Sequence, residues 1–132
     1  MKKPLEVLQL YPQHDYTLAG VFASRAGRDP KRPFVVFGDK TWSWAEFGEA
    51  VERCARLLVS RGIRKGDRVS VMGRNSDGHV LMLLSLARIG AIMVPINPEY
   101  GVEEARYVLH HAAVSAVIAS ADTLETARKA CE

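Results

Sequence analysis

Residues 65–97 read KGDRVSVMGRNSDGHVLMLLSLARIGAIMVPIN, and this stretch decides the fold. Residues 68–72 alternate in a way that predicts a short strand. Residues 80–89 are apolar on nearly every side, which predicts a helix that is buried on more than one face. Residues 91–94 predict a second short strand, which Pro95 ends. A strand, a crossover helix and a strand form a βαβ unit, which we expect to be parallel and right-handed.

The boundaries of this unit have their own signals. Gly66 and Asp67 predict a turn before the first strand. Ser76 is a good helix N-cap because its hydroxyl can accept a hydrogen bond from a free backbone N–H of the first turn. Gly90 supplies the helix stop, since glycine readily adopts the left-handed conformation in which many helices end.

The chain before this unit predicts a lead-in, a helix and a hairpin. Residues 1–16 are expected to be irregular. Thr17 can cap a short helix that Gly27 ends. Residues 33–37 (PFVVF) predict a strand, and residues 41–42 pair back onto it after a turn as a short hairpin arm.

Ser43 begins the clearest helix of the chain. It forms an S-x-x-E capping box with Glu46, in which the two side chains each satisfy an otherwise free backbone N–H. Apolar residues at helical spacing predict one buried face: Trp44, Phe47, Val51, Cys54, Ala55 and Leu58. The other face is expected to hold two i,i+4 ion pairs, Glu49 with Arg53 and Glu52 with Arg56.

The remaining elements complete an alternating pattern. Residues 102–112 predict an amphipathic helix, residues 116–119 a short apolar strand, and residues 120–131 a last helix. The predicted fold class is therefore α/β: a β-hairpin followed by β-α-β-α-β-α units, layered with a mainly parallel sheet. With 132 residues, 48% of them apolar, we expect a single domain or subdomain over residues 1–132.

Charge and cysteine usage exclude some classes. The formal net charge of +3 is a mild bias, and we expect no nucleic-acid partner. The densest basic cluster is expected to be a solvated loop: Arg25, Arg28, Lys31 and Arg32. Cys54 and Cys131 lie far apart and in no metal-like spacing, which favours a reduced, cytoplasmic protein. No apolar run is long enough to be a transmembrane segment.

A phosphate-binding loop is the first chemical feature to seek in such a fold. The sequence contains neither G-x-G-x-x-G nor G-x-x-x-x-G-K-[ST]. The nearest candidate is residues 73–76 (GRNS), at a strand-to-helix junction where backbone N–H groups could hold an anion. An ordinary turn with a serine cap is the favoured interpretation.

The other candidate residues are interpreted as structural. His110 and His111 are adjacent and point in different directions on a helix. His14 and His79 lie in unrelated places, so no metal site is expected. Cys54 lies on an apolar helix face, where packing is favoured over a nucleophile's role.

Asp67 and the two tryptophans are also interpreted as structural residues. Asp67 is interpreted as a turn residue, with general-base work as a remote alternative. Trp42 and Trp44 are interpreted as core residues rather than a stacking platform. We therefore expect no catalytic, cofactor-binding or metal-binding residue in this chain.

Five motifs, in order, resemble the opening of the adenylate-forming superfamily (AMP-dependent synthetases and ligases), which includes acyl-CoA synthetases, peptide-synthetase adenylation domains and luciferases. They are residues 41–47 (TWSWAEF), 62–69 (GIRKGDRV), 86–97 (LARIGAIMVPIN), 105–109 (ARYVL) and 115–118 (SAVI). The resemblance covers about residues 17–120. It is strongest to an acyl-CoA synthetase.

The resemblance implies a function for a longer parent protein. Such an enzyme uses ATP and Mg²⁺ to activate a carboxylic or fatty acid as an acyl-adenylate, and then forms a thioester with coenzyme A. In this family the motifs that bind ATP follow the region matched here. We therefore expect the chain to be an N-terminal fragment that is inactive alone, with the remainder of the ligase chain as its partner.

Other interpretations remain open. Strand edges and apolar faces left without neighbours predict self-association. A stand-alone α/β interaction or regulatory module that oligomerises is therefore the alternative function. A small nucleotide-binding protein using residues 73–76 ranks last, because no glycine fingerprint with a ribose-directed carboxylate is present.

Overall fold

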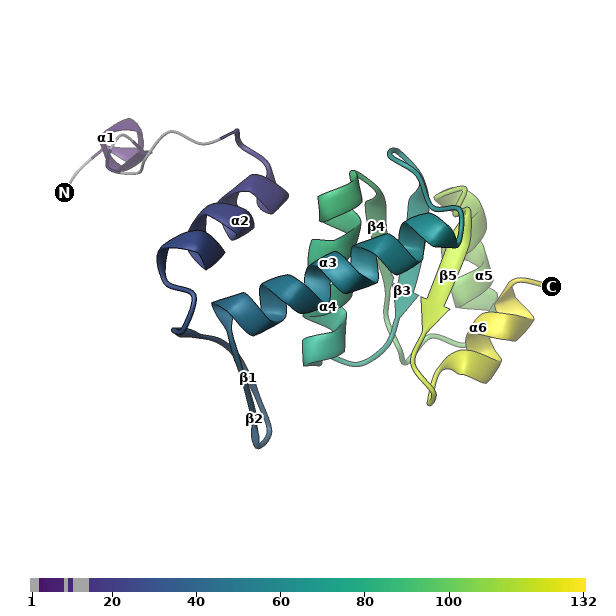
Figure 1. Cartoon of the computed structure of the whole chain (residues 1–132). Coiled ribbons are helices and arrows are strands. Elements are labelled where there is room, and N and C mark those ends of the chain that lie inside the picture. Colours follow the sequence, from purple (N-terminus) through teal and green to yellow (C-terminus); the bar gives the residue numbers. More distant parts are fainter. Residues whose placement is uncertain (1–2, 9, 11–14) are drawn as a thin grey trace.

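The computed structural model describes residues 3–8, 10 and 15–132. Its elements, in chain order, are α1 (Pro4–Leu8), α2 (Leu18–Arg28), β1 (Pro33–Phe37), β2 (Lys40–Ser43), α3 (Trp44–Ser60), β3 (Arg68–Met72), α4 (Asp77–Ile89), β4 (Ile92–Ile96), α5 (Val102–His111), β5 (Ala116–Ala119) and α6 (Leu124–Ala130). This order confirms the predicted α/β fold of a hairpin followed by alternating strands and helices (Figure 1).

A three-stranded parallel sheet forms the centre of the fold. Its strand order is β4-β3-β5, and β3 pairs in parallel with both neighbours. Ser70 of β3 lies beside Val94 of β4 and Val117 of β5. The chain first runs from β3 to β4 and then crosses to the other side of β3 to form β5. The strand order therefore reverses at β3, and the carboxyl ends of all three strands lie at one edge.

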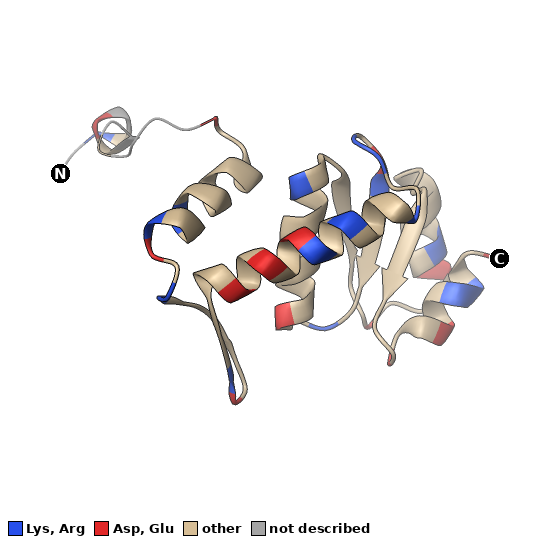
Figure 2. Ribbon diagram, viewed as in Figure 1, with Lys and Arg blue, Asp and Glu red and all other residues tan. Residues whose placement is uncertain are grey.

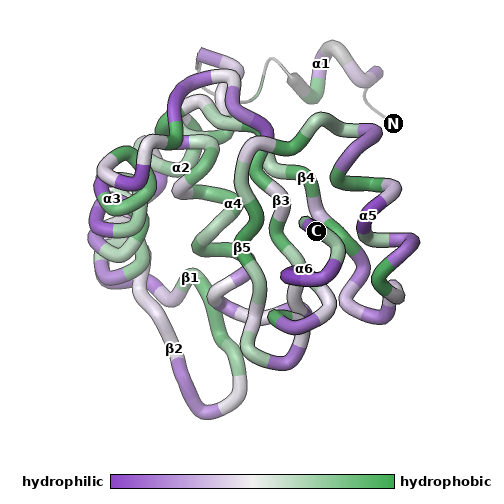
Figure 3. The backbone as a smooth tube through the Cα atoms, turned by 90° about the vertical axis from the view of Figure 1, so that its right-hand side faces the viewer, coloured by the Kyte–Doolittle hydropathy of each residue, from purple (hydrophilic) through white to green (hydrophobic). Residues whose placement is uncertain are grey.

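Helices cover both faces of this sheet (Figures 1 and 3). On one face, Val69 and Val71 pack in a cluster with Leu58 of α3 and Leu86 of α4. On the other face, Met72 packs in a separate cluster with buried residues of α5 and α6. β3 is buried on both faces, and even the polar Ser70 of its RVSVM sequence is fully buried.

The β1–β2 hairpin is a separate, antiparallel two-stranded sheet that projects away from the parallel sheet (Figure 1). Its base packs on a third cluster, whose centre is the fully buried Phe47 of α3. Phe22 of α2 and Leu84 of α4 belong to the same cluster. The rings of Phe34 and Trp44 lie 3.9 Å apart between centroids. Aromatic side chains therefore join the hairpin to the helices.

The predicted caps at Ser43, Ser76 and Gly90 are confirmed, whereas the prediction that Gly27 ends the helix before the hairpin was wrong, because α2 continues to Arg28 and Asp29 is its C-cap. The Ser43 hydroxyl accepts a hydrogen bond from the Glu46 N–H at 3.2 Å, and the Glu46 carboxylate accepts one from the Ser43 N–H at 2.8 Å. The Ser76 hydroxyl accepts a hydrogen bond from the His79 N–H at 3.2 Å. Gly90 ends α4 with a φ of 74°, which is the left-handed conformation.

The prediction that Pro95 ends the second strand of the unit was wrong. β4 continues to Ile96, and Pro95 lies beside Val71 in the parallel ladder. Within the described chain β4 is an edge strand whose one ladder partner is β3. An edge strand tolerates proline because a missing N–H on the open side costs no ladder hydrogen bond.

One helix was not expected, and another begins later than predicted. Helix α1 lies in the lead-in that was expected to be irregular, while residues 1–2, 9 and 11–14 of that lead-in lie outside the described residues. Helix α6 begins at Leu124, four residues later than predicted. The preceding residues form a turn because the Thr123 hydroxyl donates to the Met72 carbonyl at 2.8 Å, and the Thr123 N–H donates to the Ser120 carbonyl at 3.0 Å.

The basic cluster is not a continuous loop, which corrects the sequence interpretation. Arg25 and Arg28 lie in the last turn of α2, and Lys31 and Arg32 follow in the turn before β1 (Figure 2). All four residues are exposed, as expected of solvated cations. Cations at a helix C-terminus interact favourably with the helix dipole.

Of the two predicted ion pairs on α3, only one is confirmed. Glu49 pairs with Arg53 at 3.6 Å. Glu52 instead pairs with Arg88 of α4 at 2.6 Å, and so connects two helices rather than two turns of one helix. Within the described residues, no helix is both long and apolar enough to cross a membrane.

Candidate functional site

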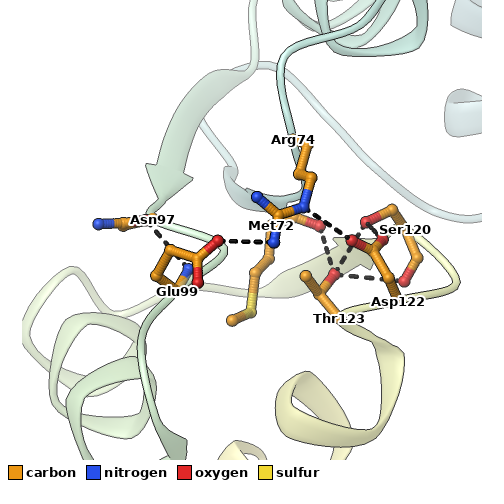
Figure 4. Close-up of polar contacts among 7 residues, drawn as sticks. All are labelled: Met72, Arg74, Asn97, Glu99, Ser120, Asp122 and Thr123. Carbon is orange, nitrogen blue, oxygen red and sulfur yellow. Dashed lines mark hydrogen bonds and ion pairs between the residues drawn. The ribbon is translucent and has the colours of Figure 1, made fainter.

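The carboxyl edge of the parallel sheet is the first place to look for a site. In open parallel sheets, ligands bind beyond the carboxyl ends of the strands, next to the strand at which the order reverses. Here that edge is formed by the segments after β3, β4 and β5, which are residues 73–76, 97–101 and 120–123. Polar side chains from all three segments gather there (Figure 4).

Arg74 connects the three segments. Its Nη2 lies 2.6 Å from Glu99 Oε1, and its Nε lies 3.5 Å from Asp122 Oδ2. All three side chains are more than half exposed, so each ion pair contributes at most about 1 kcal/mol. The guanidinium charge is nevertheless already offset by two carboxylates.

The crevice between β3 and β5 is filled by the chain itself. A Cβ atom at Gly73 would lie 3.0 Å from the Ser120 hydroxyl oxygen, so the first segment passes very close to the third. The Ser120 hydroxyl donates to Asp122 Oδ1 at 2.5 Å, and this hydrogen bond lowers the pKa of the Asp122 carboxyl. Below it, the buried Thr123 hydroxyl donates to the carbonyl that ends β3. These contacts join the first segment to the third.

The N-terminus of α4 already carries a negative charge. Asp77, the first residue of the helix, accepts hydrogen bonds from Trp42 Nε1 at 2.8 Å and from the Gly78 N–H at 2.9 Å. Lys40 lies 3.5 Å from the same carboxylate, and its ammonium lies 3.8 Å from the centroid of the Trp42 ring. The Trp42 hydrogen bond is the main cause that lowers the pKa of Asp77. The hairpin is thereby connected to α4.

These contacts bear on the anion hypothesis for residues 73–76. The Ser76 hydroxyl is used as a cap, the Arg74 guanidinium is paired twice, and the Asp77 carboxylate already accepts the Gly78 N–H of the first helical turn. The geometry therefore favours the serine-capped turn.

The histidines and cysteines are dispersed. His111 stacks on Tyr107 with 5.6 Å between ring centroids, and His110 lines a shallow depression together with the exposed Cys131. Cys54 is half-buried against the cluster between α3 and the sheet. In residues 3–8, 10 and 15–132, no three His, Cys, Asp or Glu side chains are grouped as metal ligands. His14 lies outside the described residues.

The remaining candidates have clear structural contacts. The Asp67 carboxylate accepts a hydrogen bond from the Arg64 N–H at 2.7 Å and so closes the turn before β3. Trp42 and Trp44 are half-buried against the cluster around Phe47, which confirms that they are packing residues. The ring of Trp42 meets that of Phe47 edge-on at 5.4 Å.

Sequence reasoning missed the Arg74 cluster and the contact between Trp42 and Asp77. One signal could have found the first: Arg74, Glu99 and Asp122 each follow a predicted strand by a few residues, and parallel strands bring such positions to one edge. The second had no comparable signal, because β2 and α4 are not brought together by pairing within one sheet.

The fold is thus a parallel α/β sheet with a projecting hairpin, and comparison with known proteins identifies its family. The AMP-binding enzyme family model matches residues 22–132. The chain belongs to this family of AMP-binding enzymes.

Curated relatives are considerably longer than this chain. It is 39% identical over 99 residues to a crotonobetaine/carnitine–CoA ligase of Salmonella typhimurium (strain LT2), a match that covers 65% of this chain and 19% of the ligase. It is 37% identical over 93 residues to a plipastatin synthase of Bacillus subtilis (strain 168), covering 70% of this chain and 3% of the synthase. The chain therefore spans about a fifth of the length of the ligase.

Solved structures share the same fold. A fatty acyl CoA synthetase of Mycobacterium tuberculosis aligns with a TM-score of 0.76 and 29% identity, covering 80% of this chain and 21% of that protein. An adenylation–PCP di-domain from Klebsiella oxytoca, NpsA-ThdA, aligns with a TM-score of 0.77 and 25% identity, covering 84% of this chain and 21% of that one.

Proposed function

We propose that the chain forms the opening part of the large N-terminal domain of an ATP-dependent acyl-CoA synthetase. Such an enzyme activates a carboxylic or fatty acid as an acyl-adenylate and then transfers the acyl group to coenzyme A. The observation that carries the proposal is the 39% identity to a CoA ligase over 99 residues. The likeness to a solved fatty acyl CoA synthetase supports it.

Within that enzyme the chain acts as scaffold. The scaffold role is supported by the contacts of Arg74, which is paired with Glu99 and Asp122, and by the Asp77 carboxylate at the N-terminus of α4. Residues outside this chain would therefore hold ATP, Mg²⁺ and coenzyme A. Residues 1–132 are one structural unit of a cytoplasmic ligase and are catalytically inactive alone.

A chimera tests this proposal. The segment of the Salmonella typhimurium ligase that aligns with this chain would be replaced by the corresponding segment of this chain. We expect the chimera to fold and to form acyl-CoA, because the exchanged segment supplies packing surfaces rather than catalytic groups. Assays with carnitine, crotonobetaine and a fatty acid would measure acyl-CoA formation and compare acid selectivity with that of the parent ligase.

Two controls make the result decisive. The parent ligase sets the reference rate, and the 132-residue chain alone should form no acyl-adenylate. A chimera that folds, as judged by circular dichroism and a cooperative thermal transition, yet forms no acyl-CoA would contradict the scaffold role.

A further inference from the structure

Helix α2 presents a stripe of exposed aliphatic and basic side chains, called the α2 stripe below. Its members are Leu18, Val21, Arg25 and Arg28, which follow one another at intervals of three or four residues and therefore lie on one side of the helix. Leu18 and Val21 are 47% and 38% exposed, and both arginines are exposed as well. Phe22 of the same helix is buried and packs inward. Two aliphatic side chains and two cations thus share one surface.

The positive charge continues into the turn before β1, where Lys31 and Arg32 are also exposed (Figure 2). Between Asp15 and Asp39 the chain contains four cations and one acid, Asp29, and this range therefore holds the whole formal net charge of +3. Among the described residues, none of the four cations has an ion pair or a side-chain hydrogen bond. Several arginines of the other helices, by contrast, are paired with carboxylates. The excess charge is concentrated in one place.

We propose that the α2 stripe and the two turn cations bind an anionic lipid surface. Lys and Arg side chains are attracted to acidic headgroups within a Debye length of the membrane. Leu18 and Val21 then enter the boundary between headgroups and acyl chains, as the aliphatic residues of surface-bound helices do. The chain lies on the membrane rather than in it, since no described helix is both long and apolar enough to cross one. This inference goes beyond the scaffold role and does not depend on it.

Two other kinds of anionic ligand fit these residues less well. Single-stranded nucleic acids are bound by cations together with aromatic side chains on which the bases stack, and residues 25–32 (RAGRDPKR) contain no aromatic residue. A small phosphate ligand needs several donors that converge in one pocket. The depression that Lys31 lines also contains the Glu46 carboxylate, which would repel such a ligand. An exposed array of cations beside aliphatic residues matches a broad anionic surface better.

Vesicle co-sedimentation tests the proposal. The 132-residue chain would be mixed with phosphatidylcholine vesicles that contain either no anionic lipid or about 30% phosphatidylserine. We expect binding to the anionic vesicles alone. The chain should be released when the ionic strength rises from about 0.1 M to about 1 M, because the Debye length falls from about 10 Å to about 3 Å. Equal binding to both kinds of vesicle, or binding to neither, would overturn the proposal.

Charge-matched variants locate the contact. Arg25→Gln combined with Arg28→Gln should raise the lipid concentration for half-binding about thirtyfold, since each cation near an acidic leaflet contributes about 1 kcal/mol. Arg25→Lys combined with Arg28→Lys keeps both charges and should bind within about twofold of the wild type. Arg56→Gln removes an exposed charge on α3 and should also bind within about twofold of the wild type. Unchanged binding in the double glutamine variant would overturn the proposal.

Two further measurements separate a lipid surface from other polyanions. Leu18→Ser combined with Val21→Ser should weaken vesicle binding about fivefold, because less apolar surface enters the headgroup boundary. Both sites are exposed, so circular dichroism should show an unchanged fold. A DNA duplex at the same phosphate concentration should not displace the chain from the vesicles. Displacement by the duplex, or binding that the serine variant leaves unchanged, would overturn the assignment to lipid.

Discussion

The strands of the parallel sheet and those of the hairpin differ in how far they are covered and paired. In the sheet, β3 is covered by helices on both faces and paired on both edges, and Val69 is fully buried. In the hairpin, β1 is paired on one edge, and Val36 is mostly exposed. An isolated two-stranded hairpin is at best marginally stable in water. The hairpin must therefore depend on side-chain contacts with α2, α3 and α4.

The two regions are therefore stabilised by different contacts. The sheet is stabilised by two clusters, to which α3 and α4 contribute on one face and α5 and α6 on the other. The hairpin is stabilised by aromatic packing around Phe47 and by the hydrogen bond from Trp42 to Asp77. Changes in the sheet should therefore lower the stability of the whole chain, whereas changes at the hairpin contacts should act locally.

The largest expected effect is in the sheet. Leu86→Ala removes a fully buried side chain between α4 and β3 and should lower the free energy of unfolding by about 3 kcal/mol, since a cavity remains. Urea denaturation followed by circular dichroism measures it. The matched control is Leu83→Ala on the same helix, where the leucine is 40% exposed and the loss should stay below about 1 kcal/mol. Equal losses in the two variants would show that the sheet is not the stable core.

A smaller and local effect is expected at the hairpin. Trp42→Phe keeps an aromatic ring against Phe47 but removes the hydrogen bond to the Asp77 carboxylate. We expect the hairpin to lose about 2 kcal/mol of local stability, because this bond involves a charged acceptor. Hydrogen exchange should become faster in residues 33–43 and remain unchanged in β3. Faster exchange in β3 as well would mean that the two regions unfold as one unit.

The helix between the two regions should show an effect of about 1 kcal/mol. Ser43→Ala removes one half of the capping box at the start of α3. Thermal unfolding of this variant would be compared with that of Ser60→Ala at the other end of α3, whose hydroxyl donates to the Leu57 carbonyl. A larger loss for Ser60→Ala would contradict the role assigned to the cap.

The smallest expected effect is on how the stability of the folded chain changes as the pH falls into the acid range. The Trp42 hydrogen bond lowers the pKa of Asp77 below its ordinary value of 3.8 in the folded chain. A carboxyl with a lowered folded pKa stabilises the chain above its unfolded pKa and loses that contribution as the pH falls through the folded value. Asp77→Asn should therefore be less stable than the wild type at neutral pH, and the difference should shrink in acid. A difference that is constant between neutral pH and pH values below 3.8 would exclude this linkage.

Local elements could be predicted from the sequence because local patterns determine them. The strands at residues 68–72 and 116–119 have the predicted bounds, since each is a short apolar run between turn residues. The capping box at Ser43 and the glycine stop at Gly90 were also visible as motifs. Each of these features depends on neighbours a few residues away.

The features at Pro95, Glu52 and Arg74 that were not predicted depend on residues far away in the sequence. Pro95 stays in β4 because that strand lies at the edge, which follows from the order β4-β3-β5 and not from the local sequence. Glu52 reaches Arg88 because α3 packs on α4. Arg74 meets its two carboxylates only once the three strands are aligned. Of these three features, only the Arg74 cluster had a sequence signal, because its members each follow a predicted strand.

Calorimetric titration of the 132-residue chain with ATP and Mg²⁺ tests the central claim, that this member of the AMP-binding enzyme family contributes scaffold and no nucleotide site of its own. We predict no saturable heat, because Arg74 is already paired and Asp77 occupies the N-terminus of α4. Saturable binding that is lost in Arg74→Ala would contradict the account and would place a nucleotide site at residues 73–76.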